Sequence, residues 1–158
     1  MTPPVSVTYD TVFGEGWVAF ADDEIVATGL PGSVNPYPLG EPSPPAAKLA
    51  EQLQQYWAGG SLPDVPRAVM ASAARTDLDA RIYERVAAIP PGHTMTYAAV
   101  AESVGRPGAA RAVGAAMAAN RFAPMIPCHR VVGSDGTLRG YAGGLDMKRY
   151  LLEMEANA

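Results

Sequence analysis

The chain has 158 residues, 48% of them hydrophobic, which suffices for one domain or two small ones with a packed core. A single cysteine excludes a disulfide scaffold and fits a reducing cytoplasm, and with only two histidines beside it we expect no metal site. The net charge of −4 argues against a uniformly basic nucleic-acid binder, and no apolar run approaches the roughly 18 residues of a membrane helix.

The charge is divided unevenly along the chain. Up to residue 105 there are five basic and twelve acidic residues, whereas from 106 onward seven basic residues face four acidic ones. A polyanionic partner would therefore meet the C-terminal part. An ordinary solvated surface explains the same distribution equally well, so the charge alone leaves both open.

Residues 1–70 predict a small α/β domain. Alternating apolar residues and turn signals indicate short strands within 5–30, and a proline-rich loop follows over 31–45. Residues 46–57 place Leu49, Leu53, Tyr56 and Trp57 on one face of a helix, with Pro44 and Pro45 suited to its first turn. Residues 60–76 carry weak signals and are expected to link this domain to a second one over 77–158.

The second domain is predicted to be mainly helical. Residues 77–89 form an amphipathic helix that Pro90-Pro91-Gly92 ends. Thr96 can cap a helix that Gly105 closes, and Pro107 is expected to open another one through about residue 119. Two short helices joined in this way make a helix-turn-helix pattern, although helical hairpins without DNA are common.

The second helix of this pair consists largely of alanine and glycine. It lacks the long donors with which most recognition helices read the major groove, and Arg111 is its only long cationic side chain. It could lie closely against a narrow groove. A tightly packed core helix would have the same composition, but burial of an unpaired Arg111 would be costly.

Cys128 and His129 form the pair most suggestive of chemistry. A neutral imidazole beside a thiol can help to form the thiolate, which is the nucleophilic species. A buried cysteine beside a surface histidine explains the bare pair as well. The pair is followed by a turn signal at 134–136, a glycine-rich loop at 140–144 and an amphipathic helix over 145–155 that ends on Glu155.

Taken together and in order, these motifs resemble the O6-alkylguanine-DNA alkyltransferases, or methylated-DNA–protein-cysteine methyltransferases. The resemblance covers residues 77–158, whereas the proline-rich N-terminal part matches only in outline. Its pieces are Thr94-Met95-Thr96-Tyr97, Ala110-Arg111-Ala112-Val113-Gly114, Asn120, Pro127-Cys128-His129-Arg130-Val131, Gly140-Tyr141-Ala142-Gly143-Gly144-Leu145, Lys148, Leu151-Leu152 and Glu155.

The resemblance implies catalytic roles for five residues. Cys128 would accept the alkyl group from guanine O6, with O4 of thymine left open as a second substrate. His129 would take the thiol proton through a water, and Glu155 would orient His129. Tyr97 would donate to guanine N3, and Asn120 would hold the turn before the cysteine. Each molecule would react once, without a cofactor.

The resemblance also implies how DNA and the base are held. The protein would bind double-stranded DNA through the minor groove and flip the alkylated base out of the stack, with Arg111 entering in its place. The residues expected to contact DNA are Arg111, Thr96, Ala110, Gly114 and Arg130. Those expected to line the base and alkyl pocket are Val131, Tyr141, Ala142 and Gly143.

The resulting expectation is a monomeric, cytoplasmic DNA-repair protein, with no membrane partner. Its fold would be α/β: a small N-terminal sheet with a helix, then a winged-helix-like domain with a helix-turn-helix. A non-catalytic lesion sensor is one alternative, but such relatives have tryptophan at the position of Cys128. A winged-helix regulator with a redox thiol and a cysteine hydrolase are two others, and the regulator leaves Tyr97 and Glu155 without a purpose.

Overall fold

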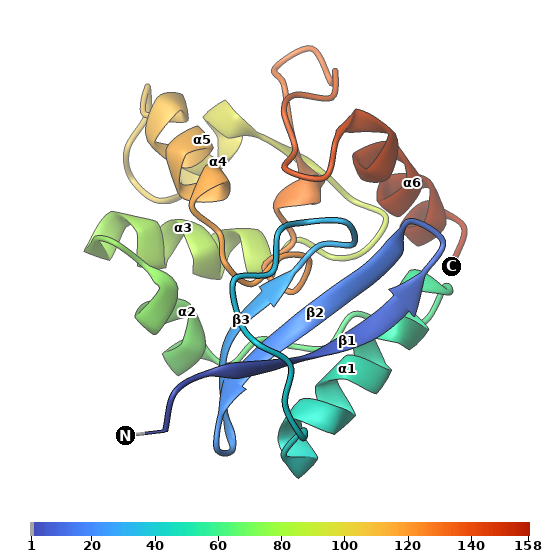
Figure 1. Cartoon of the computed structure of the whole chain (residues 1–158). Helices are drawn as coiled ribbons and strands as arrows, with labels where there is room; N and C mark the ends of the chain where they lie inside the picture. The colour runs from blue at the N-terminus through green and yellow to red at the C-terminus, as the bar shows by residue number, and fades with distance from the viewer. Residues whose placement is uncertain (1) are drawn as a thin grey trace. The chain divides into compact units, whose positions relative to one another are not determined.

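The computed structural model describes residues 2–158 and divides the chain into two compact units, Met1–Pro63 and Asp64–Ala158. Residues 64–70, which the sequence pattern groups with the N-terminal domain, belong to the second unit. The elements of both units mix helices and strands (Figure 1), so the expected α/β class is confirmed. None of the helices among residues 2–158 combines the length and apolarity needed to cross a bilayer.

The first unit is a three-stranded antiparallel sheet with one helix packed on it (Figure 1). Its strands are β1 (Val5–Thr11), β2 (Gly14–Ala21) and β3 (Glu24–Gly29), joined by tight turns in the order β1-β2-β3. Helix α1 (Pro44–Trp57) begins with its two prolines in the first turn, where a missing N–H costs nothing. Helix α1 buries one apolar face, as its period predicts, whereas β2 is buried without interruption from Gly16 to Phe20 and so on both of its faces.

The second unit is mostly helical. Its helices are α2 (Arg67–Ala73), α3 (Asp77–Ala87), α4 (Tyr97–Ser103), α5 (Ala110–Ala118) and α6 (Leu145–Ala156), with a 3₁₀ turn η1 (Cys128–Arg130). Two short strands, β4 (Met95–Thr96) and β5 (Val131–Val132), pair in parallel and bring the start of α4 beside the end of η1. This pairing places Tyr97 and Cys128, which lie far apart in the sequence, in the same region.

The helix-turn-helix is formed by α4 and α5, which pack against each other. The Thr96 hydroxyl accepts from the Ala99 N–H at 3.0 Å and caps α4, and Gly105 leaves the helix with a φ of +77°. Helix α5 begins at Ala110 and not at Pro107, because Gly108 adopts a φ of +85° that a right-handed helix does not permit.

One further feature differs from the sequence prediction and another agrees with it. Helix α2 was not predicted, because its seven residues are too short to show a periodic apolar face. The turn at 134–136 forms, with the Gly133 N–H donating to Thr137 O at 2.8 Å. It does not lead to a hairpin partner, however, since β5 pairs with β4.

Candidate active site

Cys128 is the first residue of the 3₁₀ turn η1, and the side chain of Asn120 contacts it. The Asn120 side-chain amide donates to Ile126 O at 2.8 Å and lies 3.4 Å from Cys128 Sγ, while its oxygen accepts from the Phe122 N–H at 2.9 Å. Asn120 follows α5, so it joins the end of this helix to the segment that carries the thiol. The thiol is therefore buried at a defined place.

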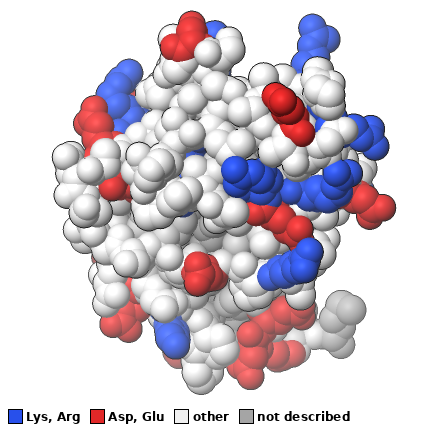
Figure 2. Space-filling view, turned by 180° about the vertical axis from the view of Figure 1, so that it is seen from behind, with Lys and Arg blue, Asp and Glu red and all other residues white. Residues whose placement is uncertain are grey.

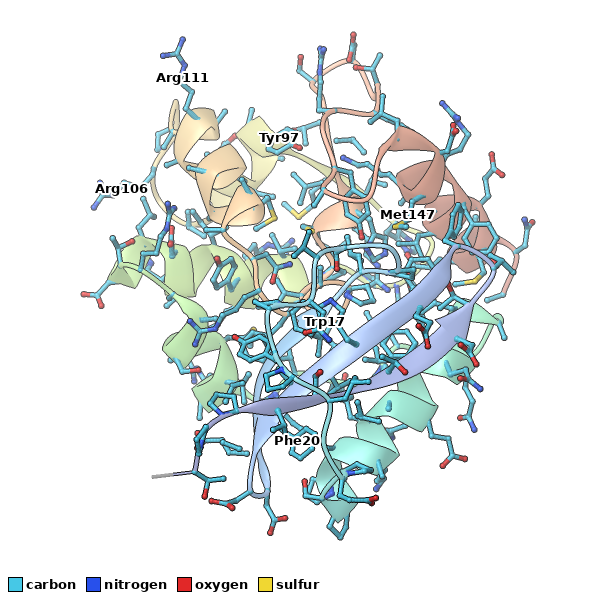
Figure 3. All side chains as sticks on the ribbon, in the orientation of Figure 1. Trp17, Phe20, Tyr97, Arg106, Arg111 and Met147 are labelled. Carbon is cyan, nitrogen blue, oxygen red and sulfur yellow. The ribbon has the colours of Figure 1, made fainter. Side chains whose placement is uncertain are left out.

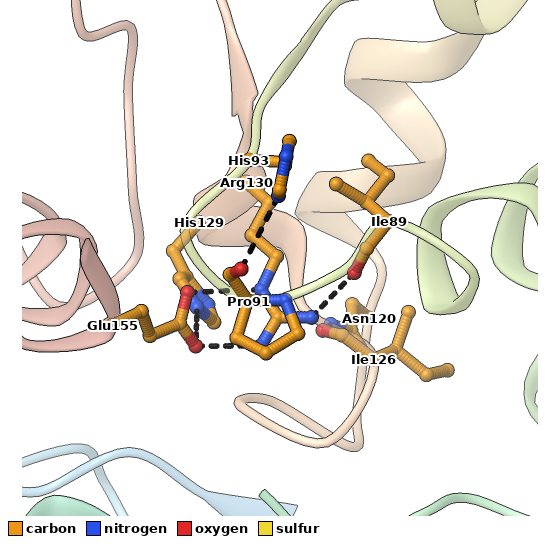
Figure 4. A network of polar contacts seen from close by, with 8 residues as sticks. All are labelled: Ile89, Pro91, His93, Asn120, Ile126, His129, Arg130 and Glu155. Carbon is orange, nitrogen blue, oxygen red and sulfur yellow. Dashed lines mark hydrogen bonds and ion pairs between the residues drawn. The ribbon is translucent and has the colours of Figure 1, made fainter. Parts of the chain in front are cut away.

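His129 and Glu155 form a buried pair beside the thiol. His129 Nε2 lies 3.0 Å from Glu155 Oε2, and the exposed fractions of the two residues are 0% and 6% (Figure 4). The pair joins η1 to the last turn of α6, across 26 residues of sequence. Two of the predicted catalytic residues are thus brought into direct contact.

Arg130, predicted to contact DNA, lies in the interior, so that prediction is wrong. Only 3% of the residue is exposed. Its guanidinium donates to Glu155 Oε1 at 2.9 Å and Oε2 at 2.6 Å, and to Ile89 O at 2.6 Å (Figure 4). Because its donors are used inside the fold and the side chain is covered, Arg130 has no surface with which to reach a phosphate.

The electrostatic state of the site favours a protonated thiol beside a neutral base. Burial raises the pKa of the Cys128 thiol, and the Asn120 amide and the nearby Lys148 charge partly oppose this rise. Burial lowers the pKa of His129, against the opposing effect of Glu155. The imidazole is therefore neutral near pH 7 and able to accept a proton, which the thiol must lose before it can attack.

The lowered pKa of His129 makes the stability of the fold dependent on pH. Below its ordinary value of 6.5, the unfolded chain binds a proton that the folded one does not. The free energy of unfolding should therefore decrease as the pH falls from 6.5 to 5.5, by at most about 1.4 kcal/mol. Urea unfolding at pH 7.5, 6.5 and 5.5 measures it. His129→Gln should reduce this pH dependence of the free energy of unfolding, whereas His93→Gln, at an exposed site, should not. An equal pH dependence in all three proteins would contradict the assignment.

Lys148 is a buried member of the site whose role the sequence did not reveal. Its exposed fraction is 0%, and Nζ donates to Val131 O at 2.8 Å and to Arg139 O at 3.0 Å. The ammonium thereby joins β5 to the start of the glycine-rich loop. A signal was present, since Lys148 lies three residues before Leu151 and so on the same face of α6.

Tyr97 and the predicted pocket residues come from the start of α4, from β5 and from the glycine-rich loop. Tyr97 is half-buried at the start of α4, and burial together with the nearby Cys128 raises its pKa. Val131 is fully buried, and the ring of Tyr141 stands edge-on to the ring of His129, with centroids 6.4 Å apart. Ala142 is exposed and Gly143 half-buried, both in the turn of the glycine-rich loop. The loop therefore borders the site.

The predicted DNA contacts on α5 lie on its outer face. Arg111 is exposed and, like Arg106, extends away from the ribbon (Figure 3). Ala110 and Gly114 are partly exposed, and a Cβ added at Gly114 would meet no atom within 4 Å. The opposite face of the helix is buried through Val113, Ala116 and Met117. Helix α5 therefore packs on one side and presents small residues on the other, which combines the two alternatives that its composition left open.

Thr96 and the surface charge also bear on the expected contact with DNA. Thr96 is partly buried and its hydroxyl already accepts the α4 cap bond, although it can still donate. On the face seen in Figure 2, basic and acidic side chains stand next to each other. Charge on that face therefore does not by itself outline a nucleic-acid surface.

Comparison with known proteins agrees with this arrangement. Residues 77–157 match the family model of the 6-O-methylguanine DNA methyltransferase DNA-binding domain. A methylated-DNA–protein-cysteine methyltransferase of Mycobacterium leprae is 44% identical over 109 residues, 69% of this chain and 64% of the relative. One of Methanosarcina barkeri is 44% identical over 110 residues, 70% of this chain and 68% of that protein.

Solved structures resemble the chain over nearly its whole length. The crystal structure of O6-methylguanine methyltransferase from Mycobacterium tuberculosis has a TM-score of 0.81 at 32% identity, covering 98% of this chain and 94% of that one. The structure of Mycobacterium tuberculosis OGT in complex with DNA has a TM-score of 0.79 at 30% identity, covering 98% and 92%. The match to the Mycobacterium leprae protein spans a little under two thirds of that relative's length. Because the family model matches residues 77–157, just over half of this chain, the chain belongs to the 6-O-methylguanine DNA methyltransferase family.

Proposed function

We propose that this protein repairs DNA directly, by transferring an alkyl group from O6 of guanine to Cys128, once per molecule. The observation that carries the proposal is the buried constellation of a thiol, an adjacent neutral imidazole and a carboxylate on that imidazole. This is the nucleophile, base and orienting group of a catalytic triad. Family membership supplies the substrate, because the relatives are named for methylated DNA and for a cysteine acceptor.

In the proposed reaction, the thiol proton passes through a water to His129. The sulfur then attacks the alkyl carbon in line with the bond between that carbon and guanine O6, called here the C–O6 bond. A carbon–sulfur bond forms, the C–O6 bond breaks, and its electron pair stays on the guanine, which takes up a proton equivalent to the one that the thiol lost. The thioether is stable, so the protein is consumed and no cofactor is required.

The pocket side chains would bind the guanine and relieve its developing charge. Burial and the nearby Cys128 raise the pKa of Tyr97, so its hydroxyl stays protonated and would donate to guanine N3. The Ala142 N–H would address O6 in the manner of an oxyanion hole. The carbonyls of Cys128 and Val131 would accept from the exocyclic amine; Val131 O already accepts from Lys148, but a carbonyl oxygen has a second lone pair.

For DNA, we propose that the outer face of α5 enters the minor groove. Its partly exposed small residues, Ala110 and Gly114, allow close approach, and Arg111 projects from the first turn to fill the place of the flipped base. A monomer suffices for this arrangement. A duplex is thus the expected partner, with the alkylated guanine extruded into the pocket beside Cys128.

Intact-protein mass spectrometry tests the function. The protein is incubated with a duplex carrying one O6-methylguanine, then weighed and digested for peptide mapping. One added methyl group on Cys128, in proportion to the lesion, is expected. Tight binding of the lesion with no added mass would instead make the protein a lesion sensor. If the protein neither gains mass nor binds the lesion, the winged-helix regulator with a redox thiol becomes the better description.

A further inference from the structure

Arg130 is a buried cation beside the candidate site, with 3% of the residue exposed. Its guanidinium contacts both oxygens of Glu155 and the carbonyl of Ile89, at 2.6 to 2.9 Å, from inside the fold (Figure 4). We propose that Arg130 is a positioning residue, which holds the Glu155 carboxylate ionised and oriented so that His129 donates from Nε2 and accepts at Nδ1. The inference rests on the proposed function for its effect on rate.

Glu155 is buried and needs compensation for its charge. A carboxylate in the interior is costly unless it is paired and hydrogen-bonded. The planar fork of an arginine meets two carboxylate oxygens at once, which a lysine cannot do. Arg130 takes Oε1 and Oε2, while His129 shares only Oε2. Glu155 therefore has a buried counter-ion that does not depend on the protonation of His129.

Arg130 also fixes the position of the Glu155 carboxylate. The bond from Arg130 Nη1 to Ile89 O fixes the guanidinium against the chain just after α3, while Nε and Nη2 face Glu155 on α6. Arg130 thereby joins three segments: the end of α3, η1 and α6. With both its oxygens occupied, the carboxylate cannot turn away from His129 without breaking a bond to Arg130.

The ionised Glu155 selects one tautomer of His129. An ionised carboxylate only accepts, so Nε2 must carry the hydrogen and Nδ1 must be the nitrogen that receives a proton. The groups that interact with this ring are Glu155 and Lys148 from α6, Arg130 from η1, and Tyr141 from the glycine-rich loop. The positive charges of Arg130 and Lys148 oppose protonation, and Glu155 favours it.

This arrangement determines where the thiol proton stops. It moves from Cys128 to His129 Nδ1, and Arg130 keeps Glu155 from taking it further, because a carboxylate bound to a guanidinium is a weak base. The Glu155 charge then stabilises the imidazolium that forms. Loss of Arg130 should leave Glu155 able to share the Nε2 proton or to turn away from the ring.

The experiment compares Arg130→Lys and Arg130→Met with the native protein. The tautomer of His129 is observed by NMR of protein with ¹⁵N-labelled histidine, and its signals are assigned with His93→Gln. Native protein should show hydrogen on Nε2. Arg130→Met should show mixed tautomers, and its transfer rate at saturating lesion DNA should fall at least about tenfold, with DNA affinity unchanged. Arg149→Lys, an exposed arginine on α6, is the control and should change neither quantity.

Arg130→Lys keeps a positive charge beside Glu155. It therefore still tests the proposal if Arg130→Met, which leaves Glu155 without a counter-ion, does not fold. Arg130→Lys should remain folded by circular dichroism, yet show part of the tautomer shift and rate loss, because an ammonium donates from a single atom and cannot reproduce the two parallel bonds of the guanidinium to Glu155 together with its bond to Ile89 O. A tautomer and rate equal to the native ones in Arg130→Lys would overturn the proposal, as would weakened DNA affinity with an unchanged tautomer. Native protein that transfers nothing, while the variants still shift the tautomer, would refute the proposed function and support the positioning role.

Discussion

Replacing Cys128 with serine is expected to abolish methyl transfer to the protein while leaving its affinity for DNA unchanged. A serine hydroxyl is far less acidic than a thiol, so the neutral imidazole of His129 cannot generate a useful concentration of the attacking anion. Removal of a nucleophile commonly costs at least about a thousandfold in rate. Asn120 Nδ2 can donate to the new oxygen as it meets the sulfur now, so the fold should tolerate the change.

The measurement is the mass of the intact protein after incubation with the methylated duplex, together with a binding titration on the same DNA. A second variant, Cys128→Ser/Ser134→Cys, relocates the only thiol to an exposed turn. It should remain unmethylated, which separates a built site from the general reactivity of a thiol. Methyl transfer to the Cys128→Ser protein would refute the assignment of the acceptor.

The sequence could predict the elements whose signals are local. Thr96 and Gly105 bound α4 because a hydroxyl cap and a positive φ are properties of single residues. The face of α3 follows from its apolar spacing, which needs no partner. Helix α2 could not be predicted in this way, because seven residues with few polar side chains show no contrast between two faces.

The candidate site could be predicted only in part, because its pairing is tertiary. That Cys128 and His129 are adjacent is visible in the sequence, whereas the approach of Glu155, 26 residues later, depends on where α6 packs. Arg130 illustrates the reverse error. The resemblance suggested a DNA contact for Arg130, but its burial is decided by a carboxylate that the local sequence does not contain.

Replacing Arg111 with alanine is expected to slow repair of a duplex by about 100-fold and to leave the reaction with free O6-benzylguanine unchanged. Flipping a base out of a duplex costs a few kcal/mol, and each 1.4 kcal/mol corresponds to about tenfold in rate. Arg111 is exposed in the first turn of α5, apart from the buried thiol, so its loss should not disturb the chemical step. Single-turnover rates on both substrates measure the difference.

Arg106→Ala provides the matched control, because Arg106 is also exposed but lies in the turn before α5 and not on the helix. It removes the same charge and should weaken binding to all DNA somewhat. Added salt should weaken binding in the same way, because both reduce the attraction to phosphates. If both variants lose only salt-dependent affinity, Arg111 acts as a general phosphate contact. If Arg111→Ala slows both substrates equally, it acts on the pocket. Only a loss confined to the duplex, at saturating DNA, assigns Arg111 to the space that the flipped base leaves.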